Sequence, residues 1–138
     1  FDDPMQSVQI AYNKKDEIIR EILGLSPNVK LNNTSELTLF KIVKDIYNDA
    51  IYQYKAEWLG KQSIDIYIPS RRLAIEYQGE QHYNPVDIFG GEKALIHQKE
   101  LDNRKRKLCI ENKIRLIEWK YDKKITEMNL KDILKTLT

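Results

Sequence analysis

Two neighbouring segments carry the side chains best suited to chemistry. Ser63 to Ile68 and Leu73 to Gln78 alternate between apolar and polar residues, which is typical of half-buried strands. Asp65 lies on the first segment, and Glu76 and Gln78 lie two apart on the second, so Glu76 and Gln78 point to the same face. If the strands pair as a hairpin, Asp65 and Glu76 converge, and paired carboxylates beside a phosphate are what Mg²⁺ ordinarily takes from a protein.

The position of Glu76 within Leu-Ala-Ile-Glu-Tyr-Gln argues for a function. A carboxylate between residues that look buried costs several kcal/mol in desolvation unless a cation or a hydrogen-bond partner is present. The alternative is a carboxylate on a solvated strand face, or one in an ion pair, for example with Arg71 or Arg72. For either carboxylate alone we favour that alternative, and for the set Asp65, Glu76 and Gln78 we favour the metal site.

A cation-rich helix is predicted from about Glu92 to Asn112. Gln98, Asp102 and Lys105 form one polar stripe on it, at spacings of four and three residues. Lys105 also lies next to the apolar stripe, so it should be near the face turned to the sheet. The alternative is a surface ion pair between Asp102 and Lys105, which would contribute only tenths of a kcal/mol.

The histidines and the cysteine are few. His82 follows the second strand closely, where it either contacts a phosphate or moves a proton, or is a hydrogen-bonded structural residue of the loop. His97 is expected on the surface, and Cys109 is expected to be a small core residue of its helix. The single cysteine excludes an intramolecular disulfide and a multi-thiolate zinc site, which favours a reducing, cytoplasmic environment.

The elements that must position these residues can be read from periodicity and turn signals. They are expected in the order helix, helix, three strands, helix, strand, helix, which makes an α+β, three-layer fold on a small mixed sheet. Trp58 and Trp119 fall on predicted strands, so core packing is expected for both. The predicted segments are a helix at 7–23, a linker at 28–33, a helix that starts at 34–36, an extended segment at 51–58, the hairpin at 63–78, the helix at about 92–112, a strand at 114–119 and a helix at 129–137.

Length and composition restrict the class of protein. The 138 residues suit one domain with an arm, here 1–33 as N-terminal helix and linker and 34–138 as the domain. With 41% hydrophobic and 32% charged residues, the chain belongs with ordered globular proteins. It has no apolar run near the ~20 residues that cross a bilayer, and its start lacks a secretion signal, so no membrane partner is expected. Because it starts with Phe1, we expect a fragment of a longer protein.

The distribution of charge is more informative than its total. The net charge is only +2, but residues 91–124 contain eleven cations against six anions. Such a basic flank suits a polyanionic partner, and a solvated helix face explains it equally well.

Together these motifs resemble the PD-(D/E)XK nuclease superfamily, in which a helix, a three-stranded meander, a helix and a strand carry Asp on one strand and Glu-x-Lys on the next. The matching residues are Ile64-Asp65-Ile66-Tyr67-Ile68-Pro69 and Ile75-Glu76-Tyr77-Gln78. Three later motifs are similar to the branch related to very-short-patch-repair endonucleases: Gly79-Glu80-Gln81-His82-Tyr83, Asp102-Asn103-Arg104-Lys105 and Ile114-Arg115-Leu116-Ile117. The resemblance covers about Ser35 to Tyr121 and implies a restriction-endonuclease-like core.

The resemblance implies that Asp65 and Glu76 hold Mg²⁺, with Mn²⁺ as a possible substitute. Glu36, which the helix dipole would favour in any case, matches an extra acidic residue of the family, and the carbonyl of Tyr77 matches a further ligand. Gln78 falls where the family usually has a lysine. An amide can hold a water molecule but is neither a cation nor a proton acceptor, so either the metal suffices or the lysine has moved to Lys105.

The implied activity is a Mg²⁺-dependent endonuclease that hydrolyses phosphodiester bonds, in DNA rather than RNA. The expected catalytic residues are Glu36, Asp65, Glu76, Gln78 and Lys105, and the expected nucleic-acid contacts are Arg71, Arg72, His82, Arg104, Lys105, Arg106 and Lys107. The alternatives are an inactive nucleic-acid-binding module on the same fold and, more weakly, a protein-interaction domain of a larger assembly. A homodimer or further domains of a parent protein are both compatible with the sequence.

Overall fold

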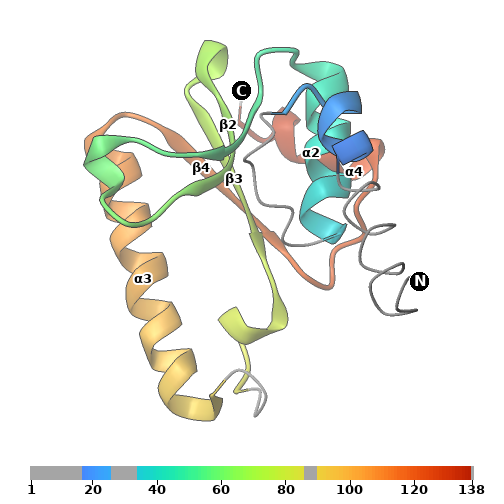
Figure 1. Ribbon diagram of the computed structural model, residues 1–138. Helices are drawn as coiled ribbons and strands as arrows, with labels where there is room; N and C mark the ends of the chain where they lie inside the picture. The colour runs from blue at the N-terminus through green and yellow to red at the C-terminus, as the bar shows by residue number, and fades with distance from the viewer. Residues whose placement is uncertain (1–16, 26–33, 86–89, 138) are drawn as a thin grey trace, which may run out of the picture.

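The computed structural model describes residues 17–25, 34–85 and 90–137. Figure 1 shows three layers, with helix α3 on one face of a sheet and helices α2 and α4 on the other. The expected mixed α+β architecture is confirmed. After a short helical segment at 17–22, the elements are α2 (Thr34–Ile46), β1 (Ile51–Tyr54), η1 (Glu57–Leu59), β2 (Ile64–Ile68), η2 (Pro69–Arg71), β3 (Leu73–Gln78), η3 (Glu80–His82), α3 (Gly91–Glu111), β4 (Arg115–Lys120) and α4 (Glu127–Lys135).

The four strands form one sheet in the order β1-β2-β3-β4. The first three are antiparallel neighbours, and β4 runs parallel to β3 after a crossover through α3. Ile66 pairs with Ile75, and because the strands are antiparallel, Asp65, one residue before Ile66, lies beside Glu76, one residue after Ile75. The alternation read from the sequence therefore corresponds to the hairpin that it predicted.

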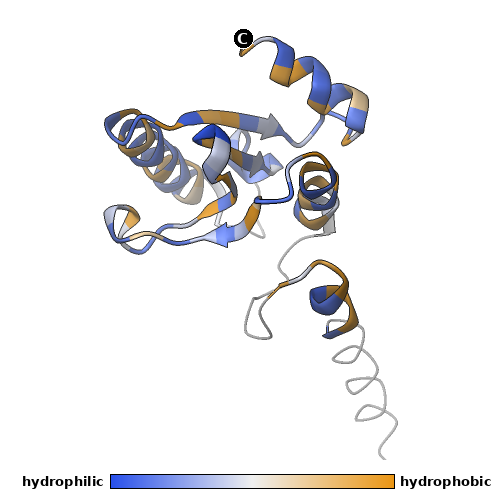
Figure 2. Cartoon of the chain, turned by 90° about the horizontal axis from the view of Figure 1, so that it is seen from above, coloured by the Kyte–Doolittle hydropathy of each residue, from blue (hydrophilic) through white to orange (hydrophobic). Residues whose placement is uncertain are grey.

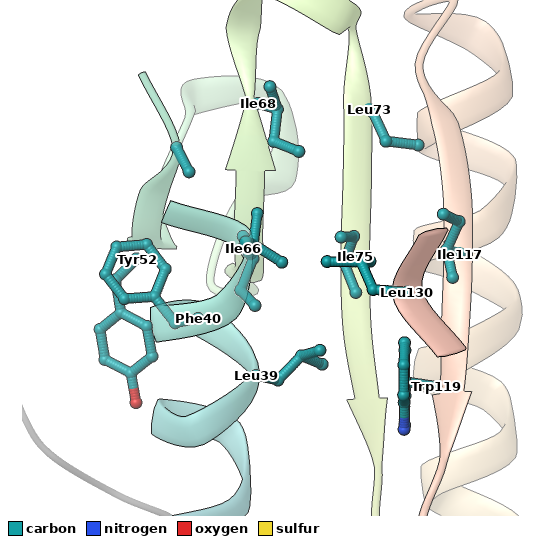
Figure 3. Close-up of a cluster of buried hydrophobic side chains, with 12 residues drawn as sticks. Leu39, Phe40, Tyr52, Ile66, Ile68, Leu73, Ile75, Ile117, Trp119 and Leu130 are labelled. Atoms are coloured by element: carbon teal, nitrogen blue, oxygen red, sulfur yellow. The ribbon is translucent and has the colours of Figure 1, made fainter. Parts of the chain in front are cut away.

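The main hydrophobic core fills the space between the sheet and helices α2 and α4. Figure 3 shows Leu39 and Phe40 from α2 and Leu130 from α4 meeting Ile66, Ile75 and Trp119 from three strands. These side chains are at most 1% exposed. The expectation that Trp119 packs in the core is confirmed.

A smaller core lies between the sheet and α3. It contains Leu59, Ile64, Ala74, Cys109 and Ile114, which confirms Cys109 as a core residue of its helix. Because helices cover both faces of β3, five of its six residues are buried, including Glu76 and Gln78. In Figure 1, α3 continues past the end of the sheet toward η3, which contacts it.

The hydropathy pattern agrees with this layering. Viewed from above in Figure 2, α2 and α4 carry apolar residues toward the sheet, whereas α3 is mostly hydrophilic. Only Asp102 and Cys109 of α3 are buried, one polar and one apolar.

Several expected boundaries need correction. Trp58 was expected on a strand, but it lies in η1 because the chain turns after Tyr54, and it packs partly buried against the smaller core. The closing helix starts at Glu127, two residues before the predicted Asn129, because the hydroxyl of Thr126 caps it by accepting from the Asn129 backbone N–H at 3.1 Å. The predicted helix at 7–23 is described only from residue 17, and the linker at 28–33 lies outside the described residues.

No helix in the described ranges is both long enough and apolar enough to span a bilayer.

Candidate functional site

Three acidic side chains from three elements gather at one end of the sheet. Glu36 comes from the first turn of α2, Asp65 from β2 and Glu76 from β3. Glu36 is 7% exposed and Glu76 is 5% exposed. One oxygen of Asp65, Oδ2, accepts the backbone N–H of Tyr77 at 2.8 Å, and the backbone N–H of Asp65 donates to Glu76 Oε1 at 3.4 Å. The sequence predicted this convergence from the hairpin and the resemblance.

Burial and the neighbouring Asp65 carboxyl group change the protonation of both glutamates. Burial, and next the charge of Asp65, raise the pKa of Glu36 to about 8. Burial, and next Asp65, also raise the pKa of Glu76 well above its ordinary value, although Lys105 acts in the opposite direction. Burial therefore favours the protonated forms of Glu36 and Glu76, and carboxyl groups with strongly raised pKa values are often found at functional sites.

Lys105 enters this cluster from α3. Its Nζ atom donates to Glu76 Oε1 at 2.7 Å, and the two side chains are 15% and 7% exposed. The alternative of a surface ion pair between Asp102 and Lys105 is wrong, because Asp102 is engaged by other residues. Lys105 therefore reaches Glu76 from helix α3, whereas position 78 on β3 is occupied by a glutamine.

Gln78 lies two residues after Glu76 on the same face of β3, and its side chain is 4% exposed. Its Oε1 atom is buried and has no hydrogen-bond partner among the described residues; the Tyr52 hydroxyl is in the same situation. Leaving a buried acceptor unpaired costs about 1–3 kcal/mol, so this oxygen is suited to accept a hydrogen bond from a ligand or a water molecule.

Gln53 also belongs to the site, and the sequence analysis did not identify it. Its side-chain amide donates to Glu36 Oε1 and its Oε1 accepts from the Ser63 hydroxyl at 3.4 Å. Its backbone φ is +54°, a left-handed conformation that a non-glycine residue adopts at some cost. The one available signal was a polar residue between the two aromatic residues of Tyr52-Gln53-Tyr54.

A second polar cluster lies one helical turn away. His82 Nδ1 is 2.8 Å from Asp102 Oδ2, and Gln98 Nε2 donates to Asp102 Oδ1 at 2.9 Å. Burial alone would raise the pKa of Asp102, but the hydrogen bonds from His82 and Gln98 outweigh it and hold that pKa below its usual 3.8. Asp102 precedes Lys105 by three residues, about 4.5 Å along the helix axis. His82 is hydrogen-bonded, as one of its two interpretations required, and Nε2 is the ring nitrogen left for a ligand.

The predicted nucleic-acid contacts are only partly gathered at this site. Arg71 lies over the Tyr47 ring at 5.4 Å and Arg72 donates to the Asn112 carbonyl at 3.1 Å, both near η2 at the other end of the hairpin. Neither arginine pairs with Asp65 or Glu76; the ion pair that the alternative required does form at Glu76, with Lys105 as its partner. On α3, Arg104 donates to the Leu59 carbonyl and to Gln62, Arg106 pairs with Glu118, and Lys107 is exposed.

No set of three or more His, Cys, Asp or Glu side chains within 17–25, 34–85 and 90–137 is arranged to hold a metal ion as it stands. In this structure Lys105 donates to an oxygen of Glu76, and the Tyr77 backbone N–H donates to one of Asp65.

Comparison with known proteins finds relatives but no characterised family. The chain is 44% identical over 73 residues to the uncharacterized protein 094L of Frog virus 3, covering 51% of this chain and 47% of the relative. It is 39% identical over 75 residues to the uncharacterized protein 307L of Invertebrate iridescent virus 6, covering 54% and 38%. It is also 39% identical over 66 residues to the uncharacterized protein 033L of Invertebrate iridescent virus 3, covering 47% and 34%.

The matches thus span less than half the length of these curated relatives. No protein-family model matches the chain, and no solved structure matches it.

Proposed function

We propose that this domain is a metal-dependent nuclease that hydrolyses phosphodiester bonds, in DNA rather than RNA. The observation that carries the proposal is the convergence of Glu36, Asp65 and Glu76 from three separate elements, with Lys105 hydrogen-bonded to Glu76. The element order α-β-β-β-α-β, with the last strand parallel to the third, supports a restriction-endonuclease-like core of the kind that the PD-(D/E)XK resemblance implies.

The side chains present suit a hard divalent cation. Mg²⁺ and Mn²⁺ prefer oxygen ligands, and three crowded carboxyl groups share a single lysine here. Gln78 adds a buried amide oxygen without a partner among the described residues. Glu36, Asp65 and Glu76 would hold the ion, with the Tyr77 carbonyl as a further ligand. When bound, the ion would supply an activated water molecule and neutralise charge that develops on the phosphate.

The remaining residues of the site would position the reactants. Lys105 places an ammonium group beside Glu76, where it can orient the attacking water, and the Gln78 oxygen can accept a hydrogen bond from that water. His82 is held through Nδ1 by Asp102, which orients Nε2 for contact with the phosphate or for proton transfer, as acceptor in the neutral ring and as donor in the imidazolium. Exposed cations, Lys107 on α3 and Arg71 and Arg72 near η2, would contact the backbone without reading its sequence.

A nucleic-acid-binding module without activity is the second candidate. It is favoured by Gln78, which replaces the lysine usual in the family, and by the ion pair that holds Lys105 on Glu76. Such a module binds with a steep salt dependence and shows no metal-dependent turnover. A protein-interaction domain binds no nucleic acid at all.

The deciding experiment is cleavage of supercoiled plasmid and of labelled single strands with Mg²⁺, Mn²⁺ or EDTA. We expect metal-dependent nicking by the monomer, with double-strand cuts left to a dimer or a parent protein. Asp65→Ala and Glu76→Ala should each abolish nicking. Glu57→Ala, which removes an exposed carboxylate of η1, is the matched control and should cut normally. If the folded native chain binds nucleic acid but cuts it with neither Mg²⁺ nor Mn²⁺, the nuclease proposal is overturned and the binding module remains.

A further inference from the structure

A second group of side chains lies beyond the carboxylates. Tyr83, Lys120 and Tyr121, named here the tyrosine-lysine cluster, come from the end of η3 and the end of β4. Lys120 Nζ lies 4.8 Å from the centroid of the Tyr83 ring and 5.9 Å from that of Tyr121, and the two ring centroids are 5.9 Å apart. Tyr83 is 37% exposed, and the Lys120 side chain is 46% exposed. The cluster therefore presents aromatic surface and an ammonium group to solvent; Lys120 Nζ also lies 3.7 Å from Asp122 Oδ2, an exposed pair that water screens.

The sheet places this cluster at the same end as the candidate site. Because β3 and β4 are parallel with Gln78 opposite Lys120, their last residues lie at one edge. Gln78 follows Glu76 by two residues, about 7 Å along the strand. The pKa of Tyr83 is raised first by burial and then by the charges of Glu118 and Asp102, so its phenol lies within electrostatic range of the Asp102 and His82 pair.

Aromatic rings next to a lysine are suited to one kind of ligand. A nucleobase stacks on an exposed ring, while the lysine attracts the adjoining phosphate. A base inside a duplex is already stacked and paired, so it cannot use the ring unless it leaves the helix.

We propose that the tyrosine-lysine cluster stacks an unpaired nucleotide beside the carboxylate site, which makes the substrate a single strand or a locally unpaired segment. This inference deepens the proposed function and rests on it for the role of the neighbouring carboxylates. The stacking itself is independent of cleavage.

The competing explanation is a structural clamp. Asn84 Nδ2 donates to the Tyr121 hydroxyl at 3.2 Å, so the cluster also ties the segment after η3 to the end of β4. A clamp predicts that loss of the Tyr83 ring changes stability and leaves the affinity for nucleic acid unchanged. Stacking predicts that loss of the Tyr83 ring lowers the affinity for nucleic acid more than it changes stability, and that single strands are affected more than duplexes.

The test is fluorescence anisotropy in EDTA with a labelled oligothymidylate of about 16 nucleotides and a mixed-sequence duplex of equal length. Tyr83→Leu should weaken single-strand binding about tenfold and change duplex binding less than twofold, whereas Tyr83→Phe, which keeps the ring, should bind like the native chain. The matched control is Tyr67→Leu, which removes a tyrosine of β2 whose ring centroid lies 4.5 Å from that of Tyr54; it should bind both ligands like the native chain.

Photocrosslinking of the native chain to an oligonucleotide with 5-iododeoxyuridine provides a measurement that needs no variant. Adducts should map to Tyr83 or Tyr121. The proposal is overturned if Tyr83→Leu, folded like the native chain, binds the single strand normally, if single strand and duplex weaken equally, or if adducts map elsewhere. If the plasmid is not cut but single-strand binding still depends on Tyr83, only the nuclease proposal is overturned. If the plasmid is cut and neither cutting nor single-strand binding depends on Tyr83, only the stacking proposal is overturned.

Discussion

The ammonium group of Lys105 donates to the carboxylate of Glu76 across 2.7 Å, joining α3 to the middle of the sheet through two side chains that are nearly buried. The contact spans 29 residues of sequence. It puts a cation where three carboxyl groups meet, so the same lysine both stabilises the metal-free fold and competes with any ion that binds there.

Lys105→Met should separate these two effects. Removing one partner of a buried pair leaves Glu76 uncompensated, so we expect the metal-free protein to lose about 3 kcal/mol of unfolding free energy. Saturating Mn²⁺ should restore part of that loss, and the Mn²⁺ midpoint should fall because a competing cation has gone. Urea unfolding with and without Mn²⁺ measures both quantities. Equal metal-induced stabilisation in the native and variant chains would contradict the competition.

The cleavage rate of Lys105→Met should fall, although its affinity for Mn²⁺ should rise. Loss of a group that orients or deprotonates water typically costs 10²–10⁴-fold in rate. In that background, Gln78→Lys should recover at least tenfold, about 1.4 kcal/mol of barrier, because it restores a lysine at the family's usual position. Single-turnover nicking rates for the two variants and the native chain provide the comparison, and no recovery in a folded double variant would argue that position 78 cannot replace position 105.

Glu36→Gln should stabilise the metal-free protein. The amide keeps the size of the side chain and an oxygen that can accept from Gln53, while it removes a carboxyl group that must take up a proton on folding at neutral pH, because its folded-state pKa is about 8. We expect a gain of about 1 kcal/mol in unfolding free energy without metal, and a smaller stabilisation by Mg²⁺ or Mn²⁺ than in the native chain. Thermal unfolding in EDTA and in metal measures this. Glu57→Gln at the exposed carboxylate of η1 should change neither value. Destabilisation by Glu36→Gln in EDTA would show that the Glu36 carboxyl group does not cost stability in the folded chain.

The pair of His82 and Asp102 predicts a defined pH dependence. Because hydrogen bonds hold the pKa of Asp102 below 3.8, its ionised form contributes stability that is fully present above pH 3.8 and is lost as the pH falls through the lowered folded-state pKa. Asp102→Asn should therefore be less stable than the native chain near neutral pH, and the difference should shrink in acid. Urea unfolding between pH 3 and 7 measures it. A difference that stays constant with pH would mean that Asp102 acts through shape and not through its charge.

Local sequence determined much of this architecture. Strict alternation in Ser63 to Ile68 and Leu73 to Gln78 places side chains on opposite faces of a strand whatever surrounds them, so the hairpin and the pairing of Asp65 with Glu76 followed from a two-residue period. The same reasoning placed Trp119 and Cys109 in the core. The prediction that Trp58 lies on a strand was wrong, because aromatic residues suit a 3₁₀ turn as well as a strand and no local pattern distinguishes the two.

Only the tertiary structure decided which charged groups meet. Lys105 had two possible partners of comparable sequence logic, Asp102 on its own helix and the sheet carboxylates, and the packing of α3 against β3 selected Glu76. The unusual φ of Gln53, its hydrogen bond to Glu36 and the approach of Tyr83 to Tyr121 likewise depend on how distant segments are packed. Charge pairing in a low-dielectric interior is set by distances of a few ångströms between elements, and residue spacing along the chain does not contain those distances.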